Sequence, residues 1–139
     1  MGYKKAQYYT LHIQQGSSHN PVDSTTYYLG GLITSPSPAQ GVGRMYIPRT
    51  ATIVTAYLFS YNDADVTNED ITFELQKNAT TDYSLFSANF GGGKSLAADA
   101  TNLDIPVSRG DYIELKITTP AWVTNPTNMR THLILLLRY

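Results

Sequence analysis

The side chains best suited to chemistry in this chain of 139 residues are three histidines and an acidic run. His12, His19 and His132 lie on three different segments. No pair has the i, i+2 or i, i+4 spacing that places two imidazoles on one face. His12 and His132 also have apolar neighbours in extended segments. We therefore expect partly buried structural histidines, and neither a metal site nor a cofactor.

The acidic run at residues 62–70 is a candidate calcium loop. Asn68 stands where such a loop needs glycine for its sharp turn, and Asp70 stands where an apolar residue is expected. A solvated hairpin loop explains the run better. Four residues with side-chain oxygens fall at offsets like those of an EF-hand, namely Asp63, Asp65, Thr67 and Glu74.

No group of residues in the sequence indicates an enzyme. Hydrolysis by two carboxylates needs them roughly 5–10 Å apart in a cleft. Turns and surface positions account for Asp104, Asp111 and Glu114 instead. The chain has no G-x-S-x-G elbow. Residues 91–95 lack the first glycine and the following helix of a phosphate-binding loop. We expect a protein that is not an enzyme and has no catalytic residue.

Trp122, the only tryptophan, falls in an irregular segment at 120–128. Exposed aromatic residues on loops stack on sugars or anchor interfaces, so Trp122, Asn125 and Asn128 are candidates for contact with a ligand or partner. The alternative is that Trp122 closes one end of a β-sandwich. The sequence leaves both interpretations open.

Strand patterns fill most of the chain, and no window of ten or more residues has a helical period with caps. Residues 71–76 and 112–118 alternate most clearly between apolar and polar side chains. The pattern predicts an all-β protein, an antiparallel β-sandwich with a jelly roll of about eight strands in one domain at 1–139. The expected strands are at 7–13, 25–29, 45–48, 52–61, 71–76, 83–87, 102–107, 112–118 and 131–139.

The expected strands at 52–61 and 131–139 are apolar on both faces. A sheet in a small domain usually has one solvated face, so these strands suggest a core on one side and a partner on the other. The strand at 131–139 should then lie inside a sheet. The candidate subunit-interface residues are Tyr57, Phe59, Tyr61, Leu133, Leu135 and Leu137.

Composition excludes several classes of partner. Lys plus Arg is 10 and Asp plus Glu is 11, so the chain has no basic footprint for nucleic acid or an anionic membrane. No apolar run approaches the roughly 18 residues of a membrane span. The basic start at 1–5 has no apolar stretch after it, so we expect no export signal. A content of 11 tyrosines with only 15% charged residues is typical of extracellular or particle-bound β proteins, whose surfaces often form interfaces.

Four stretches of the chain resemble tailed-bacteriophage structural proteins, whose jelly-roll modules sit at fibre and spike ends or on capsids. These stretches are residues 20–30, 46–53, 103–116 and 119–127. The segments IPRTATI at 47–53 and IPVSRGDYIEL at 105–115 are also similar to trimeric jelly rolls of the tumour-necrosis-factor or C1q type. The resemblance implies a homotrimer on the virion surface, made in the host cytoplasm, with other virion proteins as partners.

We therefore expect a virion structural protein that is not an enzyme. It would be a trimeric capsid-decoration module or a fibre or spike head, acting in particle assembly or host attachment. Residues 1–20 would form a docking arm and the first strand, with Lys4, Lys5, Tyr8 and Tyr9 contacting the particle. The alternative is a carbohydrate-binding module in which Trp122 and exposed tyrosines stack on a host-surface glycan.

Overall fold

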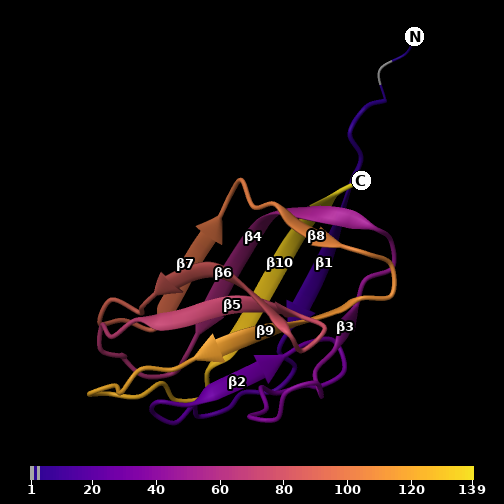
Figure 1. The fold of residues 1–139 in the computed structure, drawn as a ribbon. Helices are drawn as coiled ribbons and strands as arrows, with labels where there is room; N and C mark the ends of the chain where they lie inside the picture. The colour runs from indigo at the N-terminus through magenta and orange to yellow at the C-terminus, as the bar shows by residue number, and fades with distance from the viewer. Residues whose placement is uncertain (1, 3) are drawn as a thin grey trace.

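The computed structural model describes residues 2 and 4–139, which fold into two antiparallel β-sheets packed face to face (Figure 1). These residues form ten strands and no helix, and so no helix that could cross a membrane. The all-β sandwich predicted from the sequence is confirmed.

Sheet one has the order β1-β10-β4-β7, and β8 pairs with the first part of β4. Its strands are β1 (Tyr8–Gln14), β4 (Ala51–Tyr61), β7 (Ser95–Ala100), β8 (Ile105–Val107) and β10 (Arg130–Arg138). Sheet two has the order β2-β9-β5-β6, and β3 also pairs with β9. Its strands are β2 (Thr26–Leu29), β3 (Met45–Tyr46), β5 (Ile71–Lys77), β6 (Thr81–Ala88) and β9 (Tyr112–Thr118).

The connections between strands follow a jelly roll. The chain changes sheet at six of its nine connections. The connections β2–β3, β5–β6 and β7–β8 stay within one sheet. β2 and β3 lie one after the other along β9, and β7 and β8 do the same along β4. Ten short strands therefore occupy eight positions. β10 lies between β1 and β4, inside the sheet, as its two apolar faces predict.

The core lies between the two sheets. Alternation in sheet two works as predicted, because its inward residues are at most 3% exposed: Ile71, Phe73, Leu75, Ile113, Leu115 and Ile117. Sheet one supplies the facing layer from β4, β10 and β1, with residues that include Ile53, Leu58, Leu133, Leu135, Leu137 and Ile13.

Two features of sheet one differ from the prediction. Strand β7 was not predicted, because alanine is a poor strand former and Ala97, Ala98 and Ala100 dominate it. In β4 a bulge at Val54 pairs Thr55 with Leu136 but Ile53 with Leu137. The bulge turns Ile53 into the core, although strict alternation had placed it on the face of Tyr57.

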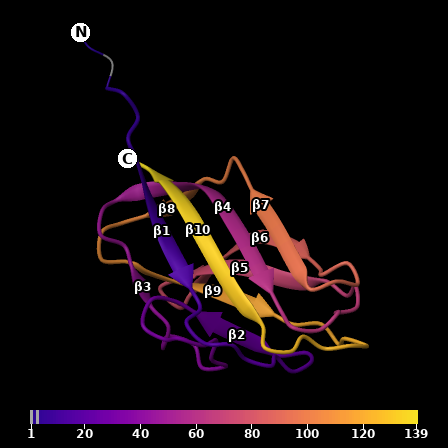
Figure 2. The same cartoon turned by 180° about the vertical axis from the view of Figure 1, so that it is seen from behind.

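The two ends of the described chain lie at one end of the sandwich (Figures 1 and 2). Gln7 and Tyr139 exchange backbone hydrogen bonds of 3.3 and 2.9 Å there. Four loops gather at the opposite end, where the Asp63 nitrogen donates to the Thr127 oxygen and the Val66 nitrogen to the Gly93 oxygen. These loops are residues 15–25, 62–70, 89–94 and 119–129.

Candidate functional site

The outer face of sheet one, which points away from sheet two, exposes three aromatic side chains of β4. Tyr57 is 47% exposed, Phe59 52% and Tyr61 39%. They alternate with Ala56, Leu58 and Ser60, which point into the sandwich and are buried. We call the surface of Tyr57, Phe59 and Tyr61, with their cross-strand neighbours His132, Ile134 and Ala97, the aromatic face.

Neighbouring strands set the shape and charge of the aromatic face. Phe59 lies between His132 of β10 and Ala97 of β7, and Tyr57 lies between Ile134 and Asp99 in the same order. An open hollow of about 490 Å³ borders Tyr57 and Phe59. Among the described residues, Asp99 is the one acidic residue that lines the hollow. Arg130 and Arg138 lie outside the hollow, at the two ends of β10.

Three of the candidate interface residues are not on this face. Leu133, Leu135 and Leu137 are each 0% exposed, with their side chains in the core between the sheets. The prediction that they lie at a subunit interface is wrong. β10 is apolar on both sides, and the residues it presents outward are His132, Ile134 and Leu136, which are half-buried.

Two histidines meet beside the aromatic face. His12 of β1 pairs with Ile134, and His132 pairs with Gln14, so the two side chains are diagonal neighbours on one side of the sheet. His12 Nδ1 lies 3.1 Å from His132 Nε2. Spacing along the sequence could not indicate this pair, because the two histidines lie on different strands. Burial, and then the neighbouring His12, lower the pKa of His132, so its neutral form is favoured.

Trp122 closes the loop end of the sandwich and is only 5% exposed. The Trp122 backbone nitrogen donates to Asp23 Oδ1 over 3.3 Å, and the next nitrogen, of Val123, donates to Glu69 Oε1 over 3.0 Å. The buried ring offers no face on which a sugar could stack. The interpretation of Trp122 as a contact residue is therefore wrong, and its alternative as an end plug holds.

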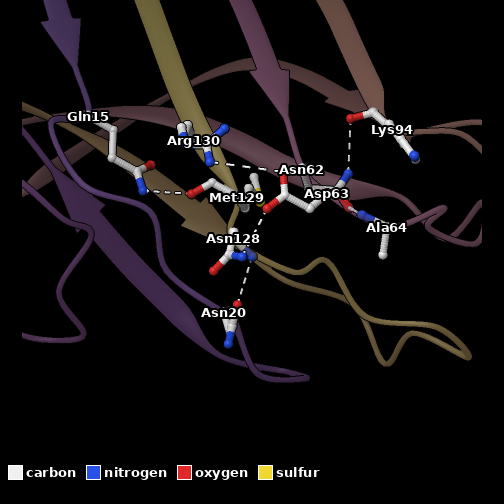
Figure 3. A network of polar contacts seen from close by, with 9 residues as sticks. All are labelled: Gln15, Asn20, Asn62, Asp63, Ala64, Lys94, Asn128, Met129 and Arg130. Carbon is white, nitrogen blue, oxygen red and sulfur yellow. Dashed lines mark hydrogen bonds and ion pairs between the residues drawn. The ribbon is translucent and has the colours of Figure 1, made fainter.

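Asn125 and Asn128 are exposed, but their side chains hold the loops to each other. Asn125 Nδ2 donates to Asp23 Oδ1 over 2.7 Å, and Asn128 Nδ2 donates to Asp63 Oδ2 over 2.9 Å. Figure 3 shows the second contact within a wider network, in which the Asn128 nitrogen donates to Asn20 Oδ1. These amides act as internal ties in the loop end.

The acidic loop belongs to the same network. Asn62 is fully buried and donates to the Lys94 oxygen over 3.0 Å, while its own Oδ1 accepts from the Ala64 nitrogen (Figure 3). Asp63 turns toward Asn128 and lies 3.9 Å from Arg130, and Glu69 turns toward Val123. Within residues 2 and 4–139, no three His, Cys, Asp or Glu side chains are grouped to hold a metal.

The candidate docking residues divide into two kinds. Lys4 and Lys5 are exposed, on a segment that runs away from the sandwich (Figures 1 and 2). Tyr8 is 51% exposed. Tyr9 is already engaged within the chain, because its hydroxyl donates to the Arg49 oxygen over 2.6 Å and its ring lies 5.7 Å from that of Tyr139.

Glu114 is a buried carboxylate, and the prediction that it lies on the surface is wrong. It is 0% exposed beneath the loop that joins β2 to β3. Its Oε1 accepts from the Gly41 nitrogen over 2.8 Å and its Oε2 from the Gly43 nitrogen over 2.9 Å. The only feature of the sequence that indicates this contact is the pair of glycines at 41 and 43. It does not identify Glu114 as the hydrogen-bond acceptor.

Comparison with known proteins adds nothing to this description. No protein-family model matches the chain, and a search of curated proteins finds no similar sequence. The class of the protein therefore follows from its structure: it is an antiparallel β-sandwich with jelly-roll connections. The surface feature that stands out on this sandwich is the aromatic face.

Proposed function

We propose that this chain is a structural protein of a virus particle that works by self-association and not by catalysis. In this proposal three copies assemble through the aromatic face, as a capsid-decoration module or as a fibre or spike head. The observation that carries the proposal is the exposure of Tyr57, Phe59 and Tyr61 side by side along one strand in the middle of a sheet.

The size of the aromatic face supports an interface. An aromatic side chain buries 150–250 Å², so three of them, each close to half exposed, present about 300 Å². A patch of that size lies at the lower end of the range for the largest apolar patch on a monomer, a patch that is often functional. Covering it contributes about 7 kcal/mol per copy, so contributions from both sides of a contact offset an association cost of about 4–15 kcal/mol.

The charges around the face favour a second copy of the chain as the occupant. Asp99 lies on β7 to one side of the aromatic residues, and Arg138 lies on β10 to the other. Arg130 is also on β10, but it lies 3.9 Å from Asp63 of its own chain. Opposite charges on opposite margins of an apolar centre let the acidic margin of each copy meet the basic margin of the next. A head-to-tail contact of this kind closes into a trimeric ring when the rotation between successive copies is about 120°.

Attachment to the particle would use the other exposed segment. Lys4 and Lys5 precede β1 on the segment that leaves the sandwich, and Tyr8 follows them at the start of β1. The resemblance of four sequence stretches to phage jelly-roll modules supports placing such an assembly on a virion. The loops at the opposite end would then point outward, where a host surface could be contacted.

The test is the mass of the protein in solution, measured by light scattering. The protein concentration should run from about 1 to about 100 µM, so that an assembly with a dissociation constant of about 10 µM is seen both to form and to dissociate. We expect a trimer that Tyr57→Glu and Phe59→Glu dissociate, because each places a charge in an apolar contact. Tyr46→Glu is the matched control, since Tyr46 is 50% exposed but lies on sheet two. A monomer throughout the range, or a trimer unaffected by the β4 variants, would overturn the proposal.

A further inference from the structure

The pair of His12 and His132 carries an inference that does not depend on self-association. The two residues come from strands at opposite ends of the sequence, and the pairing of β1 with β10 brings them together. His12 Nδ1 and His132 Nε2 are 3.1 Å apart, and the ring centroids are 5.4 Å apart with an angle of 31° between the planes. Two ring nitrogen atoms thus face each other on the outside of the sheet.

This spacing is also that of two nitrogens bound to one metal ion. With metal–nitrogen bonds of about 2.0–2.1 Å and bond angles of about 90–109°, two ligand nitrogens lie about 2.9–3.4 Å apart. The observed separation falls inside this range. The two rings lie end to end, so both side chains must rotate for their lone pairs to converge on one ion, while the strands stay in place. Fixing both ligands on a hydrogen-bonded sheet lowers the entropy that binding must overcome.

Imidazole binds metals in its neutral form, so an ion that binds displaces any proton held between the two nitrogens. The surroundings are uncharged at the pair itself, since its neighbours in the register are Gln14 and Ile134. Other titratable groups on this side of the sheet are Tyr8 on β1, Arg130 and Arg138 on β10, Tyr57 and Tyr61 on β4, and Asp99 on β7.

We propose that His12 and His132 form a surface binding site for one late transition-metal ion, of the class Zn²⁺, Ni²⁺ or Cu²⁺. Two imidazoles select this class, whereas Ca²⁺ and Mg²⁺ prefer oxygen ligands. No third His, Cys, Asp or Glu joins the pair within the part of the chain that the structure describes. In a single chain, where the aromatic face is uncovered, the remaining coordination positions of the ion are open to water or to an exchangeable ligand.

The test is calorimetric titration of the untagged protein with ZnCl₂ and NiCl₂ at pH 7.5 in a buffer that does not bind metals. We expect one ion per chain, weaker binding at pH 5.5 because protons compete for the nitrogens, and no heat with CaCl₂. The double variant His12→Asn/His132→Asn should lose at least tenfold in affinity. His19→Gln removes a histidine of the loop end and should bind as the unaltered protein does.

Nuclear magnetic resonance of the unaltered protein gives a second measurement that needs no variant to fold. The ring nitrogens of His12 and His132 should shift together on addition of zinc, while those of His19 stay in place. Absence of binding at millimolar metal, equal affinity in the double variant, or shifts confined to His19 would each overturn the proposal.

Discussion

Glu114 accepts a hydrogen bond from the backbone nitrogen of Gly43 at 2.9 Å, and its side chain has no exposed surface. A Cβ built on Gly43 would lie only 2.8 Å from the Gly30 nitrogen and 2.9 Å from the carboxylate, so a larger residue does not fit. The carboxylate thus clamps the loop between β2 and β3 onto the outer side of sheet two.

Replacing this carboxylate tests the clamp. Glu114→Gln leaves one oxygen to accept, but its NH₂ group then faces the N–H of Gly41 or Gly43. We expect a loss of about 2 kcal/mol in the free energy of unfolding, measured by urea denaturation, because a buried donor is left unpaired. Glu74→Gln, on the same side of sheet two and half-buried, should change it by less than about 0.5 kcal/mol. Equal losses in the two variants would contradict the role of the clamp.

Trp122 should matter for stability and not for ligand contact. Trp122→Ala empties a buried position at the loop end and should cost about 3–5 kcal/mol of unfolding free energy. Trp122→Phe should cost less, because Nε1 has no hydrogen-bond partner among the described residues. Val123→Ala is the neighbouring control, since Val123 is 84% exposed. An unchanged urea midpoint in Trp122→Ala would show that packing of the Trp122 ring at the loop end does not stabilise the fold.

The two sides of β10 should respond differently to truncation. Leu135 is fully buried, and Leu135→Ala should cost about 2–5 kcal/mol of unfolding free energy through the cavity it creates. Leu136 is half-buried on the outer side, so Leu136→Ala should cost clearly less. Thermal unfolding of both variants at one concentration makes the comparison. A larger loss for Leu136 would mean that the strand presents its faces the other way round.

The free energy of unfolding should fall as the pH drops below the pKa of an unperturbed histidine. Burial lowers the pKa of His19, so the unfolded chain binds more protons there than the folded chain does below about pH 6.5. This contribution is complete above that pH and is lost on acidification, with a slope of at most about 1.4 kcal/mol per pH unit. His132 has a lowered pKa and adds a loss of the same sign.

Urea midpoints at pH 7.5, 6.5 and 5.5 would check this dependence. We expect the decline to be smaller in His19→Gln, in which only the contribution of His132 and other groups remains. Lys116→Ala is a useful comparison, because its 2.7 Å ion pair with Asp82 is still formed throughout this range. It should therefore lower stability without changing the slope. The same slope in His19→Gln as in the unaltered protein would exclude His19 as the source.

Alternation in the sequence predicted much of the fold because one face of most strands is polar. Ile71, Phe73 and Leu75 alternate with polar residues, so which side is buried follows directly. β10 has no such contrast, and for Leu133 and Ile134 the sequence alone could not decide which faces the core. Local pattern determines that a strand exists, but the packing of two sheets decides which face is inside.

The features missed at the candidate site depend on contacts between distant parts of the chain. His12 and His132 are 120 positions apart, and only the register of β1 against β10 makes them neighbours. Burial of Trp122 likewise depends on loops at 62–70 and 15–25 closing over the same end. A single sequence does not contain the register, so these contacts could not be predicted from residue types and spacing.

The hydrogen bonds between Gln7 and Tyr139 also have a consequence for protein engineering. Since these two residues are already neighbours, a short peptide could join them and close the backbone into a ring. The glycine turn at 91–93 lies among the loops at the other end and could serve as the new opening, because exposed turns tolerate chain breaks. A circular permutant made in this way would keep every strand intact while moving its chain ends to the opposite pole.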